Sequence, residues 1–290
     1  MIQQKVNALL FGCRKRFSML YYYAISRSVR RRTSLRELLF HLFSPNMHAV
    51  AKQQATIVRE DDRYRYYEIR GYRDEFIYPA GAPYYSLAMI LSESRPQHWH
   101  YYEIPQTAVS ADDVVVDCGS AEGFFTFRHQ YTAGRIFALE PLPMFIDALH
   151  RQFGQSERVT ILPVAAGDSC HQAYIQRPAA HTALDATVRA TADEDSIAIE
   201  VVTLDSLFAD KGIKIDYLKA DIEGYEEPMI RGALETIRMS RPKIAVTTYH
   251  KGQDYRRLID MIRGVVPEYN YKIKGIDYLS GNPVMLHMWI

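Results

Sequence analysis

The chain has 290 residues, of which 48% are hydrophobic and 24% are charged, and its formal net charge is +1. This composition is typical of a soluble globular protein, and the total charge indicates no partner. The three cysteines, Cys13, Cys118 and Cys170, are widely spaced and form no CxxC pair, so the sequence supports neither a disulfide framework nor a zinc knuckle.

Residues 1–43 form a basic arm with nine basic residues and one acid, a charge of +8, so residues 44–290 carry −7. Near-helical spacing predicts one or two amphipathic helices that end before Pro45, with apolar positions at Leu35, Leu38, Leu39 and Leu42. A basic arm on an acidic body indicates an anionic partner, and we expect a membrane surface near lipid-linked glycans. The alternatives are helices packed on the acidic body or a disordered tail.

No segment has the length of a transmembrane helix. The apolar run Phe17–Ile25 is far shorter than the roughly 20 residues needed, and it is a poor signal peptide because basic residues follow it. We therefore expect a cytoplasmic protein, held peripherally at the inner face of the membrane.

Residues 44–110 are predicted to form a small N-terminal cap. The stretch RYRYYEIRGYRDEFIY reads as strands, and HWHYYEIP favours core or cap packing over a platform for a sugar ring.

From residue 111 to 290, strands and helices alternate. Strands are predicted at 113–118, 135–140, 159–166, 215–221 and 243–250, with extra strands at 173–176 and 197–204 around a polar loop (178–196). Helices are predicted at 124–131, 143–153, Glu226–Arg238 and Tyr255–Val266. A hairpin, which supplies one antiparallel edge strand, ends the chain. The pattern predicts an α/β fold: a Rossmann-like, doubly wound, mostly parallel sheet with an antiparallel C-terminal edge hairpin, plus the cap and arm.

The stretch VVVDCGSAEGFF places Gly119 and Gly123 in the turn after the first strand of this domain, where ligands approach the backbone of such sheets. The spacing is GxxxG instead of GxGxxG, which disfavours a pyrophosphate-binding turn.

Acids follow the next strands at the same sheet edge. Glu140 would accept hydrogen bonds from ribose hydroxyls and Asp168 from an adenine amino group, while Asp221 and Glu223 lie after the fourth parallel strand. A pocket with these acids suits a sulfonium cation, so the sequence favours S-adenosylmethionine over a dinucleotide. Taken singly, each acid is equally explained as a helix cap or a solvated carboxylate.

The motifs VVVDCGSAEGFF, FALEP, VAAGD, VVTLDSL and IDYLKADIEGYE, in this order, resemble the FkbM family of methyltransferases over about residues 76–290. The resemblance implies a class I methyltransferase fold, S-adenosylmethionine as cofactor, and O-methylation of a sugar or polyketide hydroxyl. By position, Asp117, Gly119 and Gly123 would line the methionine part, Glu140 would hold the ribose, Asp168 the adenine, and Asp221 would face the methyl group. Further candidate cofactor contacts on the same motifs are Cys118, Ser120, Phe124, Pro141 and Ala166. Ala121 stands where the family often has Asn, so one side-chain hydrogen bond is lost.

A hydroxyl acceptor is a weak nucleophile and needs a base, for which Asp221, Glu223 and His250 are the candidates. A metal-assisted variant through the same three residues ranks below a metal-free mechanism.

Three other functions are weighed. A nucleic-acid methyltransferase suits the basic arm, but Asp-Ile-Glu-Gly replaces the Asn/Asp-Pro-Pro-aromatic loop, so nucleic acid is not the expected partner. A non-catalytic adaptor is disfavoured, because Glu140 and Asp168 would have no nucleoside to bind. A nicotinamide oxidoreductase is disfavoured by the missing middle glycine.

Overall fold

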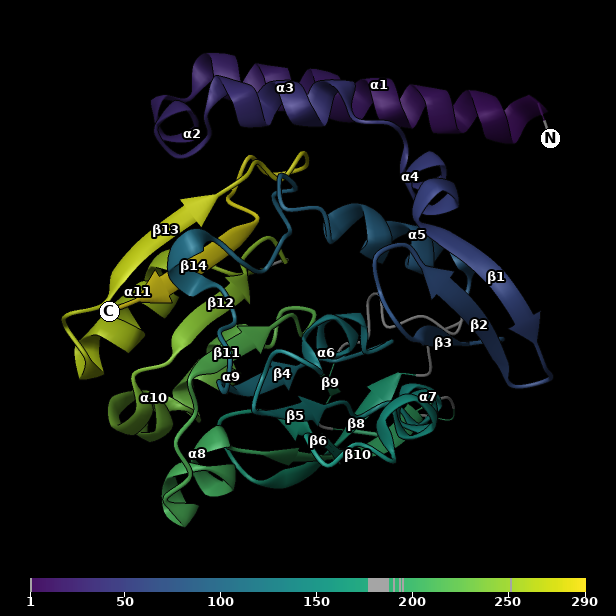
Figure 1. The fold of residues 1–290 in the computed structure, drawn as a ribbon. Helices are drawn as coiled ribbons and strands as arrows, with labels where there is room; N and C mark the ends of the chain where they lie inside the picture. The colour runs from purple at the N-terminus through teal and green to yellow at the C-terminus, as the bar shows by residue number, and fades with distance from the viewer. Residues whose placement is uncertain (1, 177–187, 190, 193, 195, 251) are drawn as a thin grey trace.

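The computed structural model describes residues 2–176, 188–189, 191–192, 194, 196–250 and 252–290, with side chains from residue 12 onward. Its centre is a seven-stranded sheet of order β13-β14-β12-β11-β4-β5-β6 (Figure 1). The strands are β4 (Val114–Cys118), β5 (Arg135–Leu139), β6 (Val159–Leu162), β11 (Tyr217–Ala220), β12 (Lys243–Thr247), β13 (Asn270–Lys274) and β14 (Met285–Trp289). Because β12, β11, β4, β5 and β6 all run parallel, the predicted fold class is confirmed.

The C-terminal hairpin differs in one detail from the prediction. Strand β14 is antiparallel to both β12 and β13, so the reversed strand lies inside the sheet and the edge strand β13 runs with the others. The buried side chains of β14 explain this placement, since an inner strand is covered on both faces, whereas β13 exposes Tyr271.

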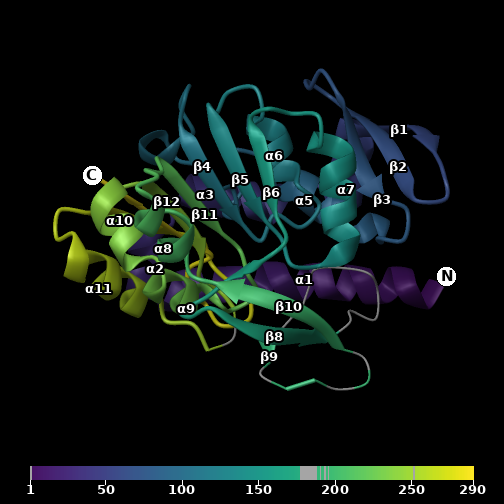
Figure 2. The ribbon, with the colours of Figure 1, turned by 90° about the horizontal axis from the view of Figure 1, so that it is seen from below.

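Helices cover both faces of the sheet (Figure 2). Neighbouring residues of β4 point to opposite faces, with Val115 in the cluster that contains α6 (Phe124–His129) and α7 (Pro143–Phe153). Val116 belongs to the cluster under the other helices, which are α8 (Leu204–Leu207), α9 (Glu226–Arg231), α10 (Leu234–Ser240) and α11 (Tyr255–Val265), with the short helix η2 (Ala209–Lys211) beside them. This alternation is the period of two expected of a strand buried on both sides.

Two predicted elements are divided in the structure. The third strand separates into β6 and β7 (Ala165–Ala166) at Pro163, which has no N–H to donate to a ladder. The predicted helix 226–238 breaks into α9 and α10 beside Gly232, where a Cβ atom would lie 2.0 Å from the carbonyl oxygen of Gly167. Close backbone contact thus selects glycine and ends the helix.

A second sheet of order β7-β10-β8-β9 lies beside the large one. It contains the predicted extra strands as β8 (His171–Gln176) and β10 (Ser196–Val202), together with β9 (Val188–Arg189). Most of the polar loop predicted between them lies outside the described residues.

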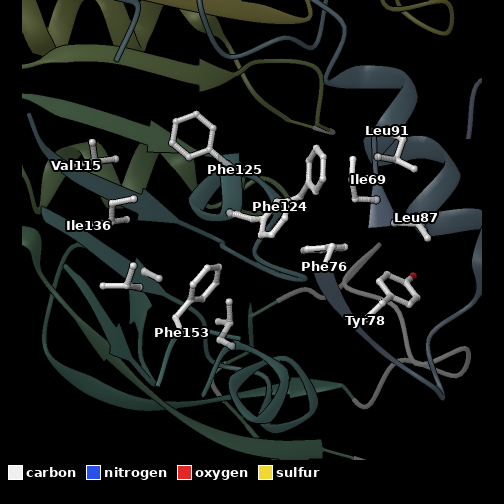
Figure 3. Close-up of a cluster of buried hydrophobic side chains, with 14 of the residues drawn as sticks. Ile69, Phe76, Tyr78, Leu87, Leu91, Val115, Phe124, Phe125, Ile136 and Phe153 are labelled. Atoms are coloured by element: carbon white, nitrogen blue, oxygen red, sulfur yellow. The ribbon is translucent and has the colours of Figure 1, made fainter. Parts of the chain in front are cut away.

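Residues 44–110 contain α4 (Met47–Gln54), a three-stranded sheet, α5 (Tyr84–Glu93) and the short helix η1 (Pro105–Thr107). The strands β1 (Ala55–Glu60), β2 (Tyr64–Ile69) and β3 (Glu75–Pro79) confirm the alternating tyrosine pattern as strands. Phe76 points toward Phe124 (Figure 3), with ring centroids 5.1 Å apart, and lies 5.2 Å from Phe127. The cap therefore shares one hydrophobic core with the α6 face of the large sheet.

The arm forms the helices α1 (Ile2–Ile25), α2 (Arg27–Arg32) and α3 (Leu35–Phe43), which ends before Pro45 as predicted. Ser34 and Glu37 make a capping box at the start of α3, a local signal that fixes where this helix begins. Met19, Val29 and Leu38 pack on Trp99 and Ile276 of the body. Within the described part of the chain, no helix is long and apolar enough to cross a membrane.

Candidate functional site

A pocket lies at the carboxyl ends of β4, β5 and β11, where an open parallel sheet binds its ligands. Its floor comes from the loops that follow these strands, and its opposite wall comes from the cap. The loop residues are Gly119, Ser120, Ala121, Glu122, Glu140, Pro141, Leu142, Asp221, Ile222 and Glu223, and the cap residues are Ser86, Met89, Ile90, Glu93, His100 and Tyr102.

The glycine turn is shaped by close contacts. Gly119 has φ +72°, and a Cβ atom there would lie 2.1 Å from the carbonyl oxygen of Asp221, so only glycine fits. Gly123 has φ +79°, and its missing side chain lets α6 begin against Leu149 of α7. Ala121 also has a positive φ of +46°, a conformation that costs alanine roughly 1–2 kcal/mol.

A buried ion pair supports this turn from below. Lys219 Nζ lies 2.9 Å from Asp117 Oδ1, and the lysine also donates to the carbonyl oxygen of Gly119 at 2.6 Å. Burial alone would lower the pKa of Lys219, but the neighbouring carboxylates of Asp117 and Asp221 raise it, so the lysine is charged. The second oxygen of Asp117 accepts from Thr126 Oγ1 at 2.8 Å. Asp117 therefore holds the loop and does not line the pocket.

Glu140 is buried and aims at the same loop. Its Oε2 accepts from the N–H of Ala121 and its Oε1 from the N–H of Leu142, both at 2.8 Å. Burial raises its pKa to about 7, although the two backbone donors oppose the shift. Burial likewise raises the pKa of Glu122 to about 7.

Asp221, in the loop after β11, contacts the cap side of the pocket. Its Oδ2 accepts from Tyr102 Oη at 2.6 Å and lies 3.5 Å from His100 Nε2, while Oδ1 lies 3.2 Å from Thr247 Oγ1. Burial alone would raise the pKa of Asp221, but the nearby imidazoles, Lys219 and the hydrogen bonds lower it to about 2. The carboxylate is therefore ionised and held in one orientation.

His250 lies behind Asp221 within a group of carboxylates. Its Nδ1 is 3.2 Å from Glu226 Oε1, and its Nε2 is 3.4 Å from Glu223 Oε2 and 3.8 Å from Asp221 Oδ1. Although burial favours the neutral ring, the hydrogen bond to Glu226 and the nearby carboxylates raise the pKa of His250 to about 9. The imidazole therefore carries a second proton near neutral pH, and a role as base first requires its loss.

Among the described residues, one group has the spacing of metal ligands, namely Asp221, Glu226 and His250. It shares two members with the set considered from the sequence and has Glu226 in place of Glu223. Glu226 Oε1 already accepts from the N–H of Ile222 and the hydroxyl of Thr247, and Gln253 donates to Oε2. The protonated His250 balances part of this charge, so the cluster is explained by protein donors.

The structure brings eight of the predicted site residues together in the pocket lining: Gly119, Ser120, Phe124, Glu140, Pro141, Ala166, Asp221 and Glu223. The others lie outside the lining: Asp117 and Cys118 are buried beneath it, Gly123 packs on α7, His250 lies behind Asp221, and Asp168 is exposed beyond Gly167.

Sequence reasoning missed several lining residues. His100, Tyr102 and Glu93 come from the cap, where the stretch HWHYYEIP was predicted to serve packing in preference to a platform for a sugar ring, and Tyr249 follows β12. Lys219 could have been found from the sequence, because it is a charged residue inside an apolar strand. The structure shows that its register partner on β4 is Asp117.

These residues fit S-adenosylmethionine. Gly119 lets the turn lie directly against the backbone of Asp221. Asp221 is ionised, Glu122 and Glu140 are partly ionised near neutral pH, and together with Glu223 these acids outnumber Lys219 in the lining, which suits a sulfonium better than phosphates. Fold and pocket thus define the class as a Rossmann-like methyltransferase.

Comparison with known proteins gives the family. The model of the methyltransferase FkbM domain matches residues 117–273, just over half of the chain. The protein belongs to the FkbM family of methyltransferases, as the ordered motifs predicted. No curated protein sequence matches the chain significantly.

Solved structures with similar folds share little sequence with the chain. The methyltransferase FkbM from Methylobacillus flagellatus KT is 17% identical with a TM-score of 0.48, and the match covers 86% of this chain and 60% of that one. This chain therefore spans less than two thirds of that protein. Fibrillarin from Aeropyrum pernix with bound S-adenosyl-L-methionine is 13% identical (TM-score 0.41, 81% and 99% covered). TYW2 from M. jannaschii with AdoMet is 14% identical (TM-score 0.44, 80% and 88% covered).

Proposed function

We propose that the enzyme transfers the methyl group of S-adenosylmethionine to a hydroxyl of a sugar in a glycan or glycolipid, or to a related secondary-metabolite hydroxyl. The observation that carries this proposal is the ionised Asp221 carboxylate on the pocket wall, oriented by Tyr102 at 2.6 Å. A hydroxyl acceptor donates one hydrogen bond, and a fixed carboxylate is the acceptor that orients it. The aromatic rings of Tyr102 and Tyr249 on the same wall offer apolar faces to a sugar ring.

We place the cofactor against the glycine turn. Gly119, Ser120 and Phe124 would contact its methionine part, with Asp117 and Gly123 shaping the turn from outside the pocket. Glu140 would hold the ribose, because a carboxylate has about four acceptor sites and the backbone occupies two. Asp168 at the outer rim stays our prediction for the adenine. We assign catalysis to residues 111–290, with 44–110 as the cap and 1–43 as the arm.

When bound, the cofactor supplies a methyl group activated by its sulfonium. In the reaction the C–S bond breaks, a C–O bond forms, and the hydroxyl proton leaves to a base. We propose that Asp221 orients the hydroxyl, and that His250, after it has lost its own second proton, takes up the hydroxyl proton beside Glu223. Cap residues line this end of the pocket, and we propose that they exclude water from the bound substrates.

The other functions have less support. The acids in the pocket oppose the phosphates of a nucleic acid, and a non-catalytic adaptor would leave the buried Glu122 and Glu140 unexplained. For location we propose peripheral attachment of the arm to the anionic cytoplasmic face of a membrane.

Calorimetric titration with S-adenosylhomocysteine, with NAD as control, tests the cofactor site. We expect micromolar or tighter binding of the first only. Asp221→Asn should keep this affinity and lower methyl transfer to a panel of glycans. Binding of neither ligand would favour the adaptor, and unchanged turnover in the variant would remove Asp221 from the mechanism.

A further inference from the structure

The arm exposes large apolar side chains to solvent. On α1 these are Phe17, Leu20, Tyr21 and Ile25, and on α3 they are Leu35, Leu39 and Phe43. Phe17 is 71% exposed and Phe43 is 79% exposed, values unusual for large apolar residues of a globular protein. Spacings of three and four residues place each set on one side of its helix.

The opposite side of each helix is already occupied. Met19 and Leu38 are buried against Trp99, whose ring stacks on His41 at 3.7 Å. Tyr22 Oη also donates to the carbonyl oxygen of Leu279 at 2.9 Å. The arm is thus fixed to the body as an outer layer in which α1 and α3 lie side by side (Figure 1), and the two exposed rows belong to one layer.

Basic residues border these rows. Arg14, Arg27, Arg31 and Arg36 are exposed, and among the described residues no ion pair joins a basic side chain of the arm to an acid of the body. The acidic body therefore leaves the arm charge unneutralised, although the two parts carry +8 and −7. Of the interpretations weighed from the sequence, packing on an acidic face is not supported, because the contact is made by apolar residues and backbone acceptors.

We infer that the outer side of α1 and α3, with the arginines that border it, is a docking face for an anionic lipid bilayer. This inference deepens the proposed membrane attachment by naming the face that enters the lipid. Leu39 and Phe43 would insert their side chains at the boundary between headgroups and acyl chains, while the arginines contact anionic headgroups. A nucleic acid would bind the arginines but leave the apolar rows exposed. A second copy of the chain could cover the apolar rows, but its arginines would repel those of the first copy.

Docking on this face also bears on catalysis. Trp99, on which the arm rests, is followed by His100, which lines the pocket. The inner side of the arm therefore contacts the residue that precedes His100 in the chain, and we take a lipid-linked acceptor as the substrate class that this arrangement favours.

Sedimentation of the full-length protein with vesicles tests the inference. Vesicles contain phosphatidylcholine alone or with about one third phosphatidylglycerol, and we expect binding only to the second, lost as salt rises from about 0.05 to 0.5 M. Replacing Arg27, Arg31 and Arg36 by Gln should weaken binding about 100-fold, since each basic residue near the surface contributes a factor of about five.

The apolar variant replaces Leu39 and Phe43 by Ser, and its matched control is Ile57→Ser, an exposed apolar residue of β1. We expect at least a ten-fold loss for the first and none for the control. All variants should bind S-adenosylhomocysteine as the unmodified protein does, which shows that they are folded.

Three outcomes would overturn the docking face. Equal vesicle binding by all variants would mean that another surface meets the membrane, whereas no vesicle binding at low salt would remove membrane attachment altogether. A dimer abolished by the Leu39 and Phe43 change, without vesicle binding, would identify a second copy as the occupant. Methyl transfer to a soluble acceptor is measured in parallel, so a failure here is distinct from a failure of the proposed reaction.

Discussion

The protonation of His250 makes stability depend on pH in a direction that can be measured. Its pKa is raised from 6.5 to about 9 in the folded protein, chiefly by the hydrogen bond to Glu226 and the charges around it, against the effect of burial. A raised pKa stabilises the fold fully below pH 6.5, and this contribution is lost as pH rises through about 9. A pKa raised from 6.5 to about 9 corresponds to about 3 kcal/mol of stability.

The assay is urea unfolding of the unmodified protein and of His250→Gln between about pH 6 and pH 10. We expect the variant to be about 3 kcal/mol less stable at pH 6 and the difference to shrink toward zero above pH 9. A difference that stays constant across this range would refute the reasoning, because it would show that the ring is not held in its charged form.

The same pKa separates the candidates for the base. If His250 takes the proton, kcat/KM rises with pH up to about 9, since only the neutral ring accepts. If Asp221, with its pKa of about 2, is the acceptor, kcat/KM is level across the neutral range. The His250→Gln variant shows which group any observed rise belongs to.

Three further predictions concern the glycine turn. Lys219→Met leaves Asp117 charged and without its lysine in the core, so it should lower the free energy of unfolding by about 3–5 kcal/mol. The double variant with Asp117→Leu removes the buried charge and should recover most of this loss. Equal instability of the single and double variants in urea would contradict the prediction. Ala121→Gly should raise stability by about 0.5–1 kcal/mol by relieving a positive φ, and a lower melting temperature would count against it. Glu140→Ala should weaken S-adenosylhomocysteine about 30-fold in calorimetry through two lost ribose hydrogen bonds, with Glu140→Gln less affected; unchanged affinity would remove Glu140 from the site.

Local patterns in the sequence were enough to predict the large sheet. The apolar strand VVVDC, the turn at Gly119 and the amphipathic helix 143–153 each carry their signal within about ten residues, and all appear in the structure. The divided elements show the limit of such patterns. Pro163 was visible in the sequence, but the break at Gly232 depends on the backbone of Gly167, which is distant in the chain.

The pocket wall shows the same limit more strongly. Tyr102 meets Asp221 across 119 residues of chain, and no periodicity indicates such a pair. The family resemblance implied that Asp117 touches the cofactor, yet the structure pairs it with Lys219 beneath the turn. A strand-end acid is thus predictable, whereas the direction in which its carboxylate points depends on the neighbouring strand.

The arm, the cap and the catalytic half are separate units in the prediction from sequence, but in the structure the arm packs on the cap and the cap packs on the catalytic half. His41 of the arm stacks on Trp99, and the adjacent His100 lies 3.5 Å from Asp221. The backbone carbonyl of Asp221 in turn faces Gly119. These contacts form a continuous series of packed side chains from the arm, through the cap, to the Asp221 carboxylate, and the cap supplies the residues in the middle of that series.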